Sequence, residues 1–237
     1  MVDDDWPLPE EEGRHATRVL RVRDGQTVRV FDGRGHEFEA VVVRIRGESV
    51  DVRVLREVGP AASETRTTVT LAQSVLKGER MDGVVRDAVM LGVSVIAPLV
   101  TTRSEVSLAA LARGHRRERW ERVAIASAKQ CGRAVVPSVC DPVDFTDFLA
   151  GTTRSGAGTV LMLVEPSTGM GAMLKNLAQA APRSAVVLVG PEGGWTPEEL
   201  SAGGAAGCLV RLGARTLRAD AAPIVALSAL LTVWREL

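Results

Sequence analysis

Two loops carry the residues whose types and spacing could do chemistry. The first, residues 190–194, reads Gly-Pro-Glu-Gly-Gly and directly follows the apolar run 185–189. A helix start comes next, because Thr196-Pro-Glu-Glu199 has a capping threonine, a proline at the first helical position and a glutamate three residues after the cap. Ligands bind where the strands of open α/β sheets end, and glycine lets backbone amides approach a ligand closely. The turn therefore indicates a ligand site, although a tight strand-to-helix turn alone would give the same pattern.

This glycine-rich turn is not one of the common nucleotide-binding motifs. It lacks the lysine and serine or threonine that end a phosphate-binding P-loop. It also differs from the Gly-x-Gly-x-x-Gly fingerprint of dinucleotide-binding folds.

The second loop, residues 212–220, reads Leu-Gly-Ala-Arg-Thr-Leu-Arg-Ala-Asp and follows another apolar run. Arg215, Arg218 and Asp220 place two cations and one acid at the end of a predicted strand. A helix is predicted from about residue 221 to 234, and Asp220 is in position to cap its amino end. The alternative is that both arginines are surface residues and that Asp220 is only a cap.

The elements around these loops predict a parallel α/β sheet. From residue 68 onward, apolar runs typical of strands alternate with helical spacing, which is the pattern of sheets covered by helices. The predicted strands are 68–73, 93–97, 159–164, 185–189 and 208–212, and the predicted helices are 80–91, 116–131 and 221–234.

The first 60 residues have a different pattern. Three segments rich in β-branched residues, 26–31, 37–43 and 49–55, predict strands, and Asp32-Gly-Arg-Gly35 is a hairpin turn signal. A small β-barrel fits this pattern, and residues 58–63 resemble a linker.

Composition restricts the possible functions. The formal net charge is zero, which argues against indiscriminate binding of nucleic acid. Arginines nevertheless concentrate in residues 14–34 and 111–122, and such segments either contact phosphates or form solvated faces. The three cysteines form no Cys-x-x-Cys pair and there are only three histidines, so neither a disulfide framework nor a metal site is expected. No signal sequence or bilayer-spanning run is evident, which favours a cytoplasmic protein.

Taken together, the two loops resemble the ribosomal small-subunit methyltransferase E family of the SPOUT superfamily. Further similarity covers residues 13–235: His15-x-x-Arg-Val-Leu-Arg21 with Asp32-Gly-x-Gly35 resembles the PUA-like N-terminal domain of the family, and the middle segment of the family is matched at 77–81, 91–93 and 130–133. The chain departs from the usual family pattern at Met90, Ala214, Asp220 and Ala221.

The resemblance implies an α/β fold in which a knotted SPOUT methyltransferase domain follows a small PUA-like β-barrel domain. The expected domains are residues 1–62 for the barrel and 68–237 for the parallel-sheet domain, whose C-terminal trefoil knot is implied by the resemblance alone. The implied activity is methylation of N3 of a uridine in 16S ribosomal RNA by S-adenosylmethionine, by a homodimer, without a metal. Two alternatives remain open: a non-catalytic RNA-binding or ribosome-assembly factor of this fold, and a transfer-RNA methyltransferase.

The resemblance also implies roles for individual residues. Arg218 would stabilise negative charge on the uracil carbonyls, and Asp220 could help to remove the N3 proton. Gly193 and Gly194 would leave room for a bent cofactor held by backbone groups. The full cofactor set is Leu163, Glu165, Gly190, Glu192, Gly193, Gly194, Leu212, Gly213 and Leu217. The expected partner is 16S ribosomal RNA within the small ribosomal subunit, and the residues expected to contact it are Arg14, His15, Arg18, Arg21, Arg23 and Arg133.

Overall fold

The computed structural model describes residues 5–156, 158–174 and 180–237. The chain divides into two compact units, and the first comprises Met1–Ser63 together with Gly132–Val135. The second comprises Glu64–Cys131 and Val136–Leu237. The short middle segment joins the first unit through a bridge between Gly33 and Val135 and a hydrogen bond from Gly35 N to Ala134 O (3.1 Å). No local feature of the sequence indicates that residues 132–135 pair with the first unit. The predicted domain limits, 1–62 and 68–237, stay predictions.

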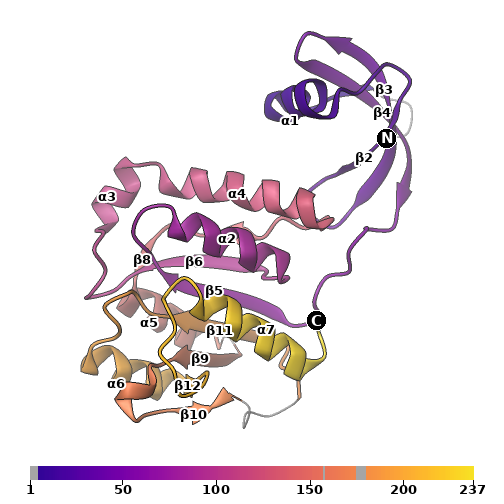
Figure 1. Ribbon diagram of the computed structural model, residues 1–237. Coiled ribbons are helices and arrows are strands. Elements are labelled where there is room, and N and C mark those ends of the chain that lie inside the picture. Colours follow the sequence, from indigo (N-terminus) through magenta and orange to yellow (C-terminus); the bar gives the residue numbers. More distant parts are fainter. Residues whose placement is uncertain (1–4, 157, 175–179) are drawn as a thin grey trace. The chain divides into compact units, whose positions relative to one another are not determined.

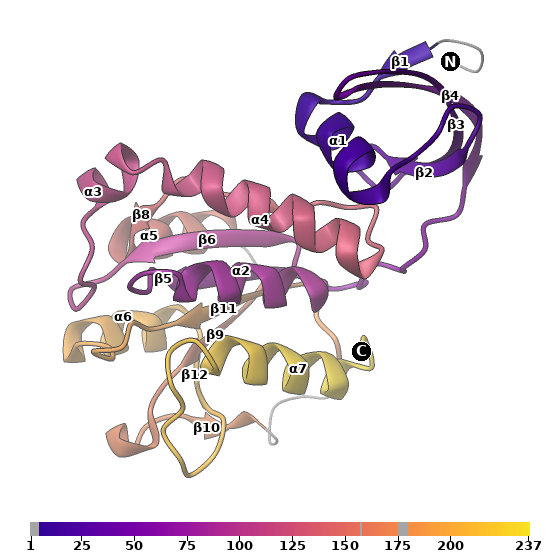
Figure 2. The ribbon, with the colours of Figure 1, turned by 45° about the horizontal axis from the view of Figure 1, so that its top comes forward.

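The N-terminal unit is built on a four-stranded antiparallel sheet, and Figure 2 shows this sheet curving around a short helix. The three predicted strands are confirmed, and a short strand at the start of the chain joins them. Valines and alanines that alternate along β3 and β4 form its small core with Ala16 and Val22. In sheet order the strands are β1 (Asp5–Pro7), β4 (Ser49–Val58), β3 (Glu37–Arg46) and β2 (Thr27–Phe31).

The short helix differs from the expectation, because the sequence analysis predicts only strands before residue 60. Helix α1 (Glu10–His15) has three acidic residues in its first turn and continues into a wider π-type turn, η1 (Ala16–Leu20). Negative charge at a helix start is favourable because the helix dipole is positive there. A side chain at Gly13 would overlap the backbone of Glu48, so this glycine lets the helix lie against the β3–β4 turn.

The second unit is the predicted parallel sheet (Figure 1). Every pairing between its strands is parallel, and β8 pairs with β6 beside the main order. The five predicted strands are confirmed, and three short strands join them. In sheet order the strands are β10 (Ala172–Met173), β12 (Cys208–Arg211), β9 (Thr159–Leu163), β11 (Ser184–Val189), β5 (Thr68–Ser74), β6 (Val95–Val100) and β7 (Ser138–Val139), with β8 (Val143–Asp144) at the side.

Strand β6 continues through Pro98, where the sequence analysis predicts its end. A proline cannot donate to a β ladder. The carbonyl of Leu99 accepts from Val75 N on the β5 side, so the neighbouring Pro98 has its backbone directed to the opposite side. On that side β7 pairs only up to Ile96 and β8 begins at Leu99, so the missing donor falls in the gap between them.

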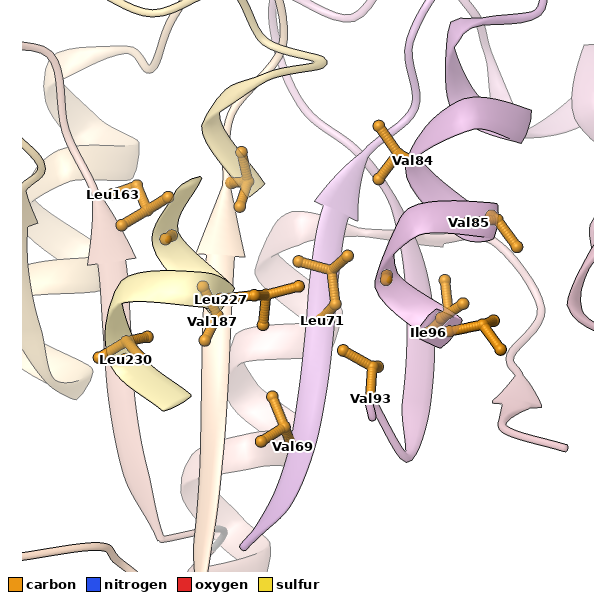
Figure 3. Packing of buried hydrophobic residues seen from close by; sticks show 14 of the residues in the cluster. Val69, Leu71, Val84, Val85, Val93, Ile96, Leu163, Val187, Leu227 and Leu230 are labelled. Atoms are coloured by element: carbon orange, nitrogen blue, oxygen red, sulfur yellow. The ribbon is translucent and has the colours of Figure 1, made fainter. Parts of the chain in front are cut away.

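Helices cover both faces of this sheet. Helices α2 (Arg80–Met90), α4 (Arg116–Cys131) and α7 (Ala222–Trp234) contribute to one apolar cluster, and α5 (Phe145–Ser155) and α6 (Pro197–Ala206) contribute to the other. Figure 3 shows the first cluster, in which Leu71 and Val187 of the strands meet Leu227 of α7. Leu71 belongs to this cluster and its neighbour Ala72 to the opposite one, because successive side chains of a strand point to opposite faces.

The strand order determines where the candidate loops lie. Strands β12, β9 and β11 are adjacent and parallel, so the loops that follow Arg211, Leu163 and Val189 leave the same edge of the sheet. These are the three loops that the sequence analysis assigns to the cofactor. The trefoil knot stays a prediction.

Candidate active site

The three loops line one cavity of about 330 Å³, within the usual size range of small-molecule sites. Apolar and charged side chains of both signs surround it. Most of the predicted site residues come together there: Leu163, Glu165, Gly190, Glu192, Gly194, Leu212, Leu217, Arg218 and Asp220. Gly193 and Gly213 are not among the lining residues.

Trp195, which the sequence did not point to, joins the loop after β9 to the glycine-rich loop. Its indole Nε1 donates to the carbonyl oxygen of Leu163 (2.8 Å), and the ring lies 5.2 Å from that of Phe145. The side chain is 8% exposed and also lines the cavity. A Cβ at Gly190 would lie 3.0 Å from the indole, so a larger residue there would press on Trp195. The available signal was an aromatic residue directly after the paired glycines.

The two glycines of the Gly-Gly pair have different surroundings. Gly194 has φ of +70°, a conformation that disfavours residues with a Cβ, and it lines the cavity. Gly193 faces Arg103, whose Cβ would be 3.1 Å from an added methyl group. The Arg103 guanidinium donates to the carbonyl oxygen of Gly193 (2.9 Å), so the side of the loop away from the main cavity is also held.

The helix start after this loop is confirmed. The Thr196 hydroxyl accepts from Glu199 N (3.2 Å), and the Glu199 carboxylate accepts from Thr196 N (2.9 Å), which completes a capping box. The other carboxylate oxygen of Glu199 accepts from Thr102 N (2.8 Å). One buried glutamate therefore fixes the start of α6 and the loop after β6 together.

The predicted cap of the last helix is wrong. The N-cap of α7 is Ala221, and Asp220 instead accepts from the Arg218 guanidinium (3.1 Å). The carbonyl oxygen of Arg218 accepts from the amides of both Ala221 and Ala222. The next residue, Pro223, has no amide proton, so the helix start has few free donors for a carboxylate cap.

Glu192 is held in position from outside the three loops. Its carboxylate accepts from the Arg80 guanidinium (3.1 Å) and lies 3.4 Å from Lys77 N. Arg80 opens helix α2 and lines the cavity, a role that the sequence analysis did not assign. The motif at 77–81 therefore contributes to the cavity wall.

The predicted RNA-contacting residues lie in the N-terminal unit. Arg14 pairs with Glu10 (2.9 Å) and with Glu48 (3.0 Å), and Arg18 also pairs with Glu48. The hydrogen bond from Arg14 lowers the pKa of Glu48, and the charge of Arg18 adds to this effect. His15, Arg21 and Arg23 are exposed nearby, and Arg21 ends the helical segment in a left-handed conformation (φ 52°). Arg133 lies on the middle segment of this unit and is buried.

Two kinds of feature are absent from the described part of the chain. No group of three or more histidine, cysteine, aspartate and glutamate side chains is placed to hold a metal ion. No helix in this part of the chain combines the length and apolar character needed to cross a membrane.

Comparison with known proteins gives consistent matches along the chain. The family model described as RNA methyltransferase domain matches residues 63–231, and the one described as RNA methyltransferase PUA domain matches residues 8–55. Two proteins named ribosomal RNA small subunit methyltransferase E are each 33% identical to this chain. The protein of Synechocystis sp. aligns over 89% of this chain and 67% of its own length, and that of Mycobacterium bovis over 92% and 83%.

A solved structure matches both units. It is the ribosomal RNA small subunit methyltransferase E of Neisseria gonorrhoeae bound to S-adenosylmethionine, with a TM-score of 0.87 and 30% identity. The match covers 99% of this chain and 94% of the other.

Proposed function

This chain belongs to the ribosomal RNA small subunit methyltransferase E family, an S-adenosylmethionine-dependent group, and we propose that it methylates N3 of a uridine in 16S ribosomal RNA. The observation that carries the proposal is the convergence of three loops on one cavity of about 330 Å³. Those loops follow three neighbouring parallel strands, at the edge where open α/β sheets bind ligands.

The cavity residues fit S-adenosylmethionine. The cofactor has an apolar-faced adenine, two cationic groups and one carboxylate. The cavity offers Leu163, Leu212 and Leu217 for the ring, and it presents carboxylates and guanidiniums for the charged groups. Gly194 leaves free the space that a side chain would fill beside the glycine-rich loop. When bound, the cofactor supplies an electrophilic methyl group, so the difficult chemistry belongs to the cofactor.

The protein must then orient the base and manage its charge. A uracil N3–H is weakly acidic, and its loss leaves negative charge on the two flanking carbonyl oxygens. Arg218 lines the cavity with a largely exposed side chain and is the proposed stabiliser of this charge. Asp220, which pairs with Arg218, is in position to orient that guanidinium, and a role in removing the proton remains a proposal. Holding the reacting atoms in line can contribute roughly 7–11 kcal/mol.

The N-terminal unit is the proposed RNA-binding part. Its exposed arginines, Arg21 and Arg23 among them, can contact phosphates, which fixes the register of the enzyme on a structured RNA. The overall neutral charge suits docking on the small ribosomal subunit in the cytoplasm more than binding to any RNA. We expect a homodimer, and sedimentation of the purified protein tests this.

Mass mapping of 16S ribosomal RNA tests the proposed reaction. Small subunits from a strain that lacks this gene are incubated with the purified protein and S-adenosylmethionine, and the RNA is digested and analysed for 3-methyluridine. One new 3-methyluridine is expected at a single position. Methylation of another atom, or of transfer RNA in a parallel reaction and not of the subunit, would refute the assignment. Absence of any methyl transfer despite cofactor binding would favour the non-catalytic alternative.

A further inference from the structure

A second hollow of about 200 Å³ lies beside the cofactor cavity. Glu165, Gly194 and Trp195 line both spaces, so a group bound in one is next to a group bound in the other. The remaining lining residues of the hollow are Arg103, Ser167, Thr168 and Gly193. Neither Arg103 nor Ser167 lines the cofactor cavity.

The polar groups of this hollow match the edge of a uracil base. That edge presents a carbonyl oxygen, the N3–H and a second carbonyl oxygen, which is an acceptor, a donor and an acceptor in order. The hollow offers the Arg103 guanidinium as a donor, the Glu165 carboxylate as an acceptor and the Ser167 hydroxyl as a second donor. The Ser167 hydroxyl donates its single proton to a Glu165 carboxylate oxygen (3.2 Å), so it turns to a carbonyl oxygen of the base once that carboxylate takes up the N3 proton.

The position of Gly194 shows that the acid and the guanidinium face one point. A methyl group added at this glycine would lie 3.0 Å from Glu165 Oε1 and 3.9 Å from Arg103 Nη1. The absent side chain therefore leaves a gap that is bordered by both charged groups. Arg103 is fixed there by its hydrogen bond to the Gly193 carbonyl oxygen (2.9 Å).

We propose that this hollow receives the target uracil and that Glu165 accepts the N3 proton, an inference that rests on the proposed uridine methylation. The N3–H bond breaks and the proton moves to the Glu165 carboxylate. The N3 electron pair then forms the bond to the methyl carbon, whose bond to sulfur breaks with its electron pair left on sulfur. Arg103 and Ser167 donate to the carbonyl oxygens, which carry the charge of the deprotonated ring.

The location of Glu165 at the shared wall supports this role over Asp220. Asp220 lines only the cofactor cavity and accepts from Arg218, whereas Glu165 borders the cofactor and the hollow together. A proton acceptor must be within reach of the base at the moment when the base meets the methyl group. Glu165 meets that requirement.

Single-turnover methylation with two RNA substrates tests the inference. Small subunits are assembled on 16S transcripts that contain either uridine or 5-fluorouridine, whose fluorine makes N3–H more acidic. Glu165→Gln should lower the rate on uridine RNA by about 10²-fold, the low end for loss of a general base, and the deficit should shrink at least about tenfold on the fluorinated RNA. Glu165→Asp keeps a carboxylate and should retain part of the rate.

Asp220→Asn is the matched control, and its rate relative to that of the wild type should be the same on the uridine and the 5-fluorouridine RNA. The affinity of each variant for S-adenosylmethionine is measured by calorimetry, because a merely structural role of Glu165 would weaken binding and slow both substrates equally. Three results would overturn the inference. They are a near-normal rate for Glu165→Gln, an equal loss of rate for Glu165→Gln on both RNAs, and a rescue by 5-fluorouridine of Asp220→Asn but not of Glu165→Gln. Failure of the wild-type protein to form 3-methyluridine would instead refute the proposed function.

Discussion

The two regions that must bind ligands are held by different kinds of interaction. In the N-terminal unit, Arg14 and Arg18 are exposed and share one half-buried partner, Glu48, across a helix and a hairpin turn. In the second unit the proposed cofactor loops are fixed by the buried Trp195 and by Glu199, which is 6% exposed. Exposed ion pairs exchange readily with water, whereas buried hydrogen bonds are costly to break. The proposed cofactor site is therefore preformed, and the arginine surface can exchange its partners.

Loss of Trp195 should break this preformed site most strongly. Trp195→Ala removes a buried ring and leaves the Leu163 carbonyl oxygen without its donor, so the free energy of unfolding should fall by about 3–5 kcal/mol. Affinity for S-adenosylmethionine should fall with it. Trp195→Phe keeps most of the packing and loses only the hydrogen bond, so it should cost about 1–3 kcal/mol. Urea unfolding and calorimetry measure both effects, and equal stability of the three proteins would contradict the role of Trp195.

Arg218 should matter for the rate and much less for the structure. Arg218→Ala should lower the single-turnover methylation rate by about 10²–10³-fold, the size seen for loss of one charge-stabilising donor. Its side chain is 71% exposed, so cofactor affinity and melting temperature should change little. Arg218→Lys should rescue the rate only in part, because an ammonium lacks the planar fork of the guanidinium. A parallel decrease in rate, cofactor affinity and melting temperature would show that Arg218 only holds the loop.

The sequence predicted those features of the two regions that depend on local signals. Helix α4 has the predicted limits Arg116 and Cys131, and the capping box of α6 is formed by Thr196 and Glu199 as expected. Both depend on residues a few positions apart, where side-chain type determines the backbone hydrogen bonds. The adjacency of the loops that begin at Leu163, Gly190 and Leu212 was implied by the family resemblance, which assigns all three to one cofactor site.

Features determined by distant residues could not be predicted in this way. Helix α1 packs on the turn at Glu48, and the segment Gly132–Val135 joins the N-terminal unit from the middle of the chain. Asp220 was a reasonable cap by position, but a guanidinium two residues away and the proline at 223 changed its partner. Arg103 was missed because it is more than 60 residues from the loops that it borders, with no motif linking them.

The glycines of the proposed cofactor loops differ in whether the backbone conformation and the neighbouring atoms require a glycine. Gly194→Ala should lower cofactor affinity by about 10-fold or more, because φ of +70° costs an ordinary residue roughly 1–2 kcal/mol and the added methyl meets Glu165 at 3.0 Å, so the loop relaxes away from the geometry that binds the cofactor. Gly213→Ala is the matched control, because an added methyl there meets no atom within 4 Å. Isothermal calorimetry with S-adenosylmethionine measures both. Equal effects of the two substitutions would mean that the loop rearranges when the cofactor binds.

The smallest expected effect concerns Glu48, and it would increase ligand binding. Because Arg14 and Arg18 hold the pKa of Glu48 below its usual value, this carboxylate stays charged at neutral pH and is protonated only as the pH falls below its ordinary range. A change of pH near neutrality therefore cannot free the two arginines, but Glu48→Gln removes the charge that occupies them. Affinity for small subunits or 16S ribosomal RNA should rise a few-fold.

The salt dependence of RNA binding tests whether Arg14 and Arg18 cause the increase in affinity. If the freed arginines contact phosphates, more counterions are released on binding, and the slope of log affinity against log salt should steepen by up to about two for Glu48→Gln. Arg14→Gln with Arg18→Gln in the Glu48→Gln background should return the slope to or below that of the wild type. Cofactor affinity, measured on the same preparations, should be unchanged in each variant. An unaltered slope for Glu48→Gln would show that Arg14 and Arg18 do not face the RNA, and the phosphate contacts of this unit would then belong to Arg21 and Arg23.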